Sequence, residues 1–223
     1  MTVFFDGEPD RLSRLVPRPF EVTDGRCMAY VCEIVSVSDS GAEMVASEPD
    51  RTIYNEAAVG VRCQYRQRAG VYFPVMWVST EWSLLRGLLN GYQKRLADKI
   101  ALTKLHPLNP GLRQLAPGAQ FGGFCVKGGQ RTLSVRVTVR KAGTQADLPN
   151  FGVTFGKRFF PRTDASQGLI QEAVEVLKSN SKSSDIWLGD GSVETTLEVG
   201  EPNAVVGAVY RTGFTISGSR VLE

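Results

Sequence analysis

Two adjacent cations, Lys94 and Arg95, are the residues in this chain whose types and spacing best fit chemistry. They lie in Gly91-Tyr92-Gln93-Lys94-Arg95-Leu96-Ala97, just after an apolar run that begins at Trp82. An ammonium beside a guanidinium and close to apolar surface suffers like-charge repulsion and desolvation, and both effects favour the neutral amine. A neutral amine can form a Schiff base with a ketone. The pattern indicates Lys94 as a catalytic lysine, and a surface Lys-Arg pair beside a buried helix is the alternative.

Other nucleophiles and cofactor sites fit the sequence less well. Lys104, Lys127 and Lys157 are rival nucleophiles, but none lies beside both an apolar helix and a second cation. The single histidine, His106, excludes any site that needs two histidines, and we expect it at a strand end or in a loop. No glycine-rich phosphate-binding loop is present. We therefore expect neither a histidine-rich metal site nor nucleotide chemistry.

The composition is that of an ordinary globular protein. The chain has 223 residues, 42% hydrophobic and 22% charged, with a net charge of +3, so we expect one domain over residues 1–223. Scattered charges and short apolar runs argue against nucleic-acid or membrane partners. Residues 1–20 lack the apolar core of a signal peptide. The four cysteines show no CxxC spacing, which favours free thiols in a reducing cytoplasm.

The hydrophobic pattern predicts a mainly β protein with few helices. Short helices are expected over 9–17 and 80–90, and the second is expected to bury its leucines. A hairpin turn is expected at 69–70 and a polar loop over 179–184. The expected strands are 28–37, 58–66, 71–78, 133–140, 151–160, 170–177, 193–199 and 204–221. So many strands with turn signals between them indicate a barrel or a sandwich.

Several segments, in order along nearly the whole chain, resemble the acetoacetate decarboxylase family. Gly91-Tyr92-Gln93-Lys94-Arg95-Leu96 is similar to the family's Schiff-base segment, usually G-[FY]-P-K-K-L, and Tyr54-Asn55-Glu56 resembles its Y-x-E segment. The other segments that carry the resemblance are Leu12–Phe20, Cys32–Val35, Leu148–Phe151 and Trp187–Leu197.

The resemblance implies a fold, a chemistry and a set of roles. The fold would be α+β and mainly β, a cone-shaped antiparallel β-barrel or double sheet with a few short helices, assembled as a homo-oligomer. The chemistry would be Schiff-base formation on a small-molecule keto acid without a cofactor. A lysine activated by a second cation is the known arrangement in acetoacetate decarboxylase itself. By position, Lys94 would be the nucleophile, Arg95 the neighbouring cation, and Glu56 and Glu33 the pocket carboxylates.

The sequence departs from the family pattern at three places. Gln93 replaces the proline before the lysine, which loosens the backbone but supplies an amide that could bind a substrate oxygen. Arg95 replaces the second lysine and keeps the charge with a different geometry. The upstream strand that supplies a substrate-binding arginine in the decarboxylases would lie before Met1 and has no counterpart in this sequence.

Four residues are candidates for binding substrate. Besides Gln93, Tyr92 lies two positions before Lys94 and could act as an acid or a base. Arg62 and Gln64 share one face of the strand expected over 58–66, and an arginine there could pair with a carboxylate. A solvated outer face is the alternative for Arg62 and Gln64.

Three functions fit these residues. The first is decarboxylation of a β-keto acid through an imine on Lys94. The second is aldolase–dehydratase chemistry, in which pyruvate or another 2-keto acid forms the imine and its enamine attacks an aldehyde. The third is a barrel that binds a small molecule without turnover, with Lys94 as a salt-bridge partner of Glu56.

Overall fold

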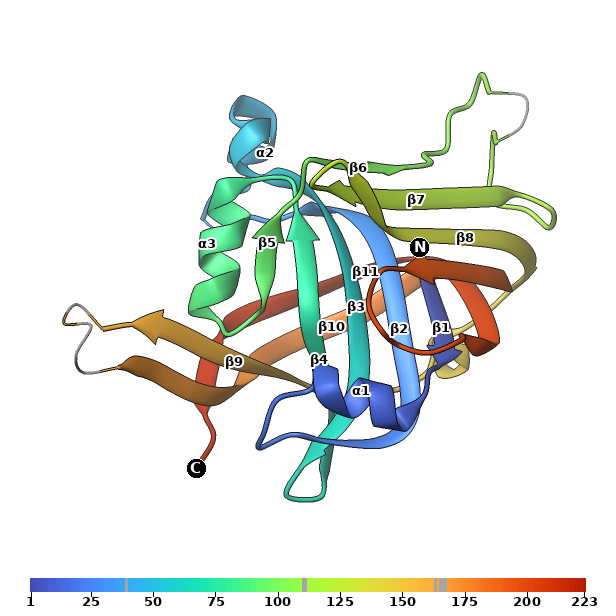
Figure 1. Cartoon of the computed structure of the whole chain (residues 1–223). Coiled ribbons are helices and arrows are strands. Elements are labelled where there is room, and N and C mark those ends of the chain that lie inside the picture. The colour runs from blue at the N-terminus through green and yellow to red at the C-terminus, as the bar shows by residue number, and fades with distance from the viewer. Residues whose placement is uncertain (39, 110–111, 163, 165–167) are drawn as a thin grey trace.

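The computed structural model describes residues 1–38, 40–109, 112–162, 164 and 168–223, and strands make up most of it (Figure 1). The helices are α1 (Pro9–Leu15), α2 (Met44–Ser47) and α3 (Glu81–Leu89), with 3-10 turns η1 (Pro49–Arg51) and η2 (Gln145–Asp147). The strands are β1 (Thr2–Asp6), β2 (Glu21–Val35), β3 (Ile53–Tyr65), β4 (Arg68–Val78), β5 (Lys94–Leu96), β6 (Lys99–Leu102), β7 (Gln120–Lys127), β8 (Gln130–Ala142), β9 (Val153–Pro161), β10 (Leu169–Thr195) and β11 (Asn203–Val221).

Seven of these strands close into a ring. Their hydrogen-bonded order is β11-β1-β2-β3-β4-β9-β10, and β10 also pairs with β11. Strands β8, β7 and β6 continue outward from β10, so the sheet has a closed part and an open part. The mainly β fold and the ring were predicted. The pairing is antiparallel except that β4 pairs in parallel with both β5 and β9.

The ring strands bury different residues on their two faces, as the alternation of a pleated strand requires. One apolar cluster joins Val31 and Val59 of the ring to Leu133 and Val135 of β8, so the open part of the sheet packs against the ring's outer face. A second cluster gathers residues of β1, β3, β4, β10 and β11, all of them ring strands: Phe4, Ala58, Met76, Val176 and Ala208. This second cluster marks the inner face of the ring, and the candidate site lies on it.

The loop expected over 179–184 is instead part of β10. Lys182 pairs with Gly213 of β11, and register shifts flank this pairing. Asn180 and Asp185 adopt positive φ of 54° and 50°, which lets the strand bulge without breaking. The prediction was wrong because this part of β10 is mostly exposed, so its sequence is polar like that of a loop.

The β3–β4 turn lies at Arg66 and Gln67, with φ of 46° and 66°, rather than at 69–70. Gly70 is inside β4 because a Cβ there would lie 2.4 Å from the ring of Phe155. Gly70 therefore allows close packing against Phe155 and does not mark a turn. All four cysteines are free, as expected. No helix in the described part of the chain has the length and apolar composition needed to cross a membrane.

Candidate active site

Lys94 begins β5, immediately after the end of α3. The connection turns sharply at Gly91, whose φ of 92° suits glycine and whose Cα lies against Val174 of β10. Tyr92 N–H then donates to the Gly87 carbonyl, and β5 joins β4 with Lys94 opposite Met76. Figure 1 shows α3 beside β5 at the edge of the ring. This placement buries Lys94, which is only 8% exposed.

The face that α3 turns toward Lys94 consists of small residues. Ser83 and Gly87 are its buried positions, while Leu85 and Leu89 are 60% and 54% exposed, so the prediction of a buried leucine face was wrong. Ser83 Oγ lies 3.1 Å from Lys94 Nζ, which donates to it. A Cβ at position 87 would lie 2.2 Å from Lys94 Cδ. The helix thus leaves just enough space for the aliphatic part of the Lys94 side chain.

The ammonium of Lys94 is paired with a buried carboxylate. Lys94 Nζ lies 2.8 Å from Glu56 Oε2, and both side chains are about 5% exposed. Tyr30 donates its hydroxyl to Glu56 Oε1 at 2.6 Å, and the Tyr54 hydroxyl lies 3.5 Å from Oε2. We call these five residues, Lys94, Glu56, Ser83, Tyr30 and Tyr54, the lysine cluster.

Burial keeps the tyrosines of this region neutral. Desolvation, and next the charge of Glu56, raises the pKa of Tyr30, Tyr54 and Tyr92 well above the usual value. Neutral phenols remain hydrogen-bond donors to the carboxylate. Lys94 Nζ also lies 5.1 Å from the centre of the Tyr54 ring and 5.9 Å from that of Tyr92. The rings add cation–π attraction to the ion pair.

The arrangement can generate a nucleophile by proton transfer. Glu56 Oε2 forms an ion pair with the Lys94 ammonium at 2.8 Å, so it is within reach to take a proton from it and to return it. The amine left behind can attack a carbonyl. Ser83 and Tyr30 hold the two partners in position during this exchange.

Two of the expected charged residues lie away from the lysine cluster. Arg95 is exposed, because successive residues of β5 project to opposite faces. Glu33 is next to Cys32, and Cys32 is the residue that pairs with Glu56, so Glu33 projects from the other face of β2. Its carboxylate forms an ion pair with Lys104. The structure therefore brings Lys94 together with Glu56 but not with Arg95 or Glu33.

Of the residues expected to bind substrate, only Tyr92 contacts the cluster. Gln93 faces away: its amide donates to the carbonyls of Gly91 and Lys157, at 3.2 and 2.6 Å, and so ties β5 to β9. Arg62 forms an ion pair with Asp24 at 2.6 Å. Because Arg62 is six positions from Glu56 on the same strand, it lies roughly 20 Å away along β3.

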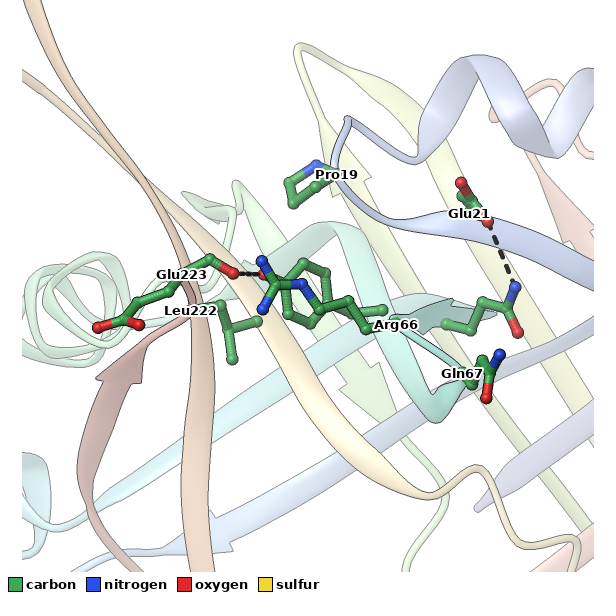
Figure 2. A pocket seen from close by; sticks show the side chains of 8 residues that line it. Pro19, Glu21, Arg66, Gln67, Leu222 and Glu223 are labelled. Carbon is green, nitrogen blue, oxygen red and sulfur yellow. Dashed lines mark hydrogen bonds between the residues drawn. The ribbon is translucent and has the colours of Figure 1, made fainter.

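Gln64 lies at the same distant end of β3. It donates to Glu21 at 3.3 Å and lines a surface hollow of about 580 Å³ (Figure 2). The other lining residues are Pro19, Glu21, Tyr65, Arg66, Gln67, Leu222 and Glu223. This hollow includes no residue of the lysine cluster.

The rival lysines have other partners. Lys104 pairs with Glu33 and Lys127 with Asp98, while Lys157 donates to the Arg18 carbonyl at 2.8 Å. Lys94 is the one lysine that is buried among the described residues.

Several residues near Lys94 were missed in the sequence. Tyr30 and Cys32 alternate on β2 and so share the inner face with Glu56. Burial, and next Glu56, raises the pKa of the Cys32 thiol to about 12. The spacing of Ser83 and Gly87 could have been used, since small residues four apart in a leucine-rich helix indicate that another element packs closely on that face. Lys178 had no such signal, because it lies on a strand more than 80 positions further along the chain.

Comparison with known proteins agrees with this architecture. The family model for acetoacetate decarboxylase matches residues 1–223, and the chain belongs to that family. A solved structure described as an acetoacetate decarboxylase-like enzyme from Sphingomonas wittichii RW1 has a TM-score of 0.90 and 38% identity, covering 100% of this chain and 89% of that one. A comparison with curated proteins finds no match.

Two further solved structures differ in how much they share with this chain. The enduracididine biosynthesis enzyme MppR, complexed with the condensation product of pyruvate and imidazole 4-carboxaldehyde, has a TM-score of 0.86 and 25% identity, with 99% and 86% coverage. The acetoacetate decarboxylase of Legionella pneumophila has a TM-score of 0.74 and 14% identity, with 100% and 85% coverage, a likeness of fold alone.

Proposed function

We propose that this protein is a lyase that forms a Schiff base between Lys94 and a keto acid. The observation that carries the proposal is the buried pair of Lys94 and Glu56, 2.8 Å apart, in a member of a family of enzymes. Glu56 lies close enough to exchange a proton with Lys94, and an adjacent general base is one of the ways in which a nucleophile is activated.

The first steps use the residues of the lysine cluster. Glu56 takes a proton from the Lys94 ammonium, and the amine attacks the ketone carbon to form a carbinolamine. Glu56 then returns a proton to the departing hydroxyl, water leaves, and the protonated imine forms. Tyr30 keeps its hydrogen bond to Glu56 throughout and so holds the carboxylate in place.

Of the reactions that can follow, we favour condensation of a 2-keto acid with an aldehyde. Glu56 would remove a C3 proton from the pyruvate imine, and the resulting enamine would attack the aldehyde carbon. Protonation of the new alkoxide, loss of water and hydrolysis of the imine would release an unsaturated 2-keto acid and free Lys94. The likeness to MppR, greater than that to the decarboxylases, supports this version.

Decarboxylation of a β-keto acid remains the second candidate. It would need the same imine, which would accept the electron pair released with carbon dioxide. The position of Arg95 on the opposite face of β5 counts against it, because a second cation beside the lysine is the known activating device in acetoacetate decarboxylase.

The test is borohydride trapping with a panel of 2-keto and β-keto acids, read by intact mass and peptide mapping. We expect a reduced adduct on Lys94 with pyruvate and none in Lys94→Ala. An adduct that has lost carboxylate from a β-keto acid would favour decarboxylation. The absence of any adduct in a folded protein would overturn the proposal and leave a barrel that binds a small molecule without turnover.

A further inference from the structure

A second lysine, Lys178, lies on the inner face of the ring near Glu56. Along β10, positions 174, 176 and 178 project to one face. Val174 packs against Gly91. A Cβ built on Gly91 would lie 2.4 Å from a methyl group of Val174. Val176 packs in the same apolar cluster as Tyr92. Lys178 is the next residue on this face.

The ammonium of Lys178 has no counter-ion. Within the described residues it forms no hydrogen bond and no ion pair. It makes a cation–π contact with Phe214, whose ring centre lies 4.7 Å from Lys178 Nζ. Lys178 is exposed at its surface, while protein atoms around the ammonium desolvate it and lower the pKa of Lys178 to about 8. Attraction to Glu56 opposes this shift.

Three arginines that could be considered for the same role, Arg95, Arg62 and Arg86, have other surroundings. Arg95 is exposed on the far face of β5, and Arg62 is paired with Asp24. Arg86 stacks over Trp82, with its guanidinium 5.1 Å from the ring centre. Glu56 is already paired with Lys94, and no other carboxylate among the described residues forms an ion pair with Lys178.

We propose that Lys178 binds the carboxylate of the keto acid whose ketone forms the imine with Lys94. This inference rests on the proposed function and assigns the substrate class, a small keto acid whose negative charge supplies the missing counter-ion. Lys178 makes no bond to the reacting carbon, so it is a binding and positioning residue. An ammonium that is partly desolvated loses little further hydration when a carboxylate arrives, which strengthens the pairing.

The test compares wild type with Lys178→Ala, Lys178→Arg and, as a matched control, Lys141→Ala, an exposed lysine of β8. Trapping on Lys94 is measured against the concentration of pyruvate and of methyl pyruvate, which has the ketone but no charge. In Lys178→Ala we expect the half-saturating pyruvate concentration to rise by roughly 10- to 100-fold, as for loss of a charged hydrogen bond. The half-saturating concentration of methyl pyruvate should not change in Lys178→Ala. Lys178→Arg should bind pyruvate nearly as well as wild type, and Lys141→Ala should behave as wild type.

A second measurement separates this inference from the proposed function. Oxamate has the carboxylate of pyruvate but forms no imine, so its binding by titration calorimetry does not depend on Lys94 chemistry. Weaker oxamate binding in Lys178→Ala supports the inference even if no adduct forms on Lys94. Equal binding to both proteins, or no binding to wild type, overturns it. An adduct on Lys178 itself would also overturn it.

Discussion

Two buried carboxylates on ring strands, Glu56 and Glu175, are held in opposite ways. Glu175 on β10 receives a bidentate pair from Arg68 of β4, at 2.6 and 2.7 Å, and a third bond from Arg220 of β11 at 2.7 Å. Glu56 on β3 receives one cation, Lys94, and two phenols, Tyr30 and Tyr54. Each carboxylate is almost inaccessible to solvent.

The difference distinguishes a structural ion-pair network at Glu175 from a reactive site at Glu56. A guanidinium does not release its proton in proteins, and its planar donors fix a carboxylate in one geometry. Glu175 therefore joins three ring strands permanently. A lysine can give up its proton to an adjacent carboxylate, so the pair at Glu56 can change its charge state during a reaction. The partner cation determines which role a buried glutamate has.

The largest effect on chemistry is expected from Glu56→Gln. The amide preserves the shape of the side chain but cannot accept the proton from Lys94, so imine formation should slow by about 10²–10⁴-fold. The rate of borohydride-trapped adduct formation with pyruvate measures this directly. An unchanged rate would show that another group removes the proton.

Glu175→Gln should have the complementary effect. It leaves Arg68 and Arg220, which are 49% and 57% exposed, without their counter-ion. Because solvent replaces part of the lost attraction, we expect the free energy of unfolding to fall by about 1–2 kcal/mol. Urea denaturation gives this value. Adduct formation per folded molecule, measured well below the unfolding midpoint, should match wild type, and a loss of chemistry here would contradict the separation of the two regions.

Gly87→Ala sharpens the contrast by moving Lys94 without removing any charge. The added methyl group would meet the lysine stem at 2.2 Å, so the amine must shift. A displacement of about 1 Å costs roughly 10²-fold in rate. Alanine favours helix formation over glycine by up to about 1 kcal/mol, which offsets some of the strain. Trapping kinetics and thermal unfolding of the same sample test both expectations, and Leu85→Ala on the exposed face of α3 is the matched control.

The smallest effect is expected at the thiols. Burial raises the pKa of Cys27, Cys32 and Cys63 to about 12, so the reactive thiolate becomes abundant only above that pH. At pH 8 the native protein should react slowly with a thiol reagent at these positions, and all four cysteines should react once it is unfolded. Fast modification of Cys32 at pH 8 would show that the inner face is more open than its burial indicates.

Much of the fold could be predicted because alternation and turn residues are local signals. The strand expected over 133–140 corresponds to β8, and the helix expected over 80–90 corresponds to α3. The errors arose where tertiary contacts override local preference. Residues 179–184 have a polar sequence but pair with β11. In α3, Ser83 occupies the buried face and Leu85 is exposed.

The candidate site was only partly accessible from sequence. Lys94 and Glu56 were expected to act together, and the structure brings them into contact. Arg95 and Glu33 were assigned by adjacency and resemblance, yet each lies one residue away from a residue on the inner face and so projects to the opposite side. Lys178, which we propose binds the substrate carboxylate, lies on β10, and no local pattern encodes the pairing that closes the ring at this strand. The homo-oligomer remains a prediction.

The length of β10 has a consequence for how the molecule comes apart. Its first third pairs with β9, its last third with β8, and β11 pairs with it over much of its length. A continuous strand shared by the ring and the open sheet cannot detach from one without pulling on the other. We therefore expect unfolding of either part to propagate to its neighbour, so that the closed and open parts come apart together under heat or mechanical load.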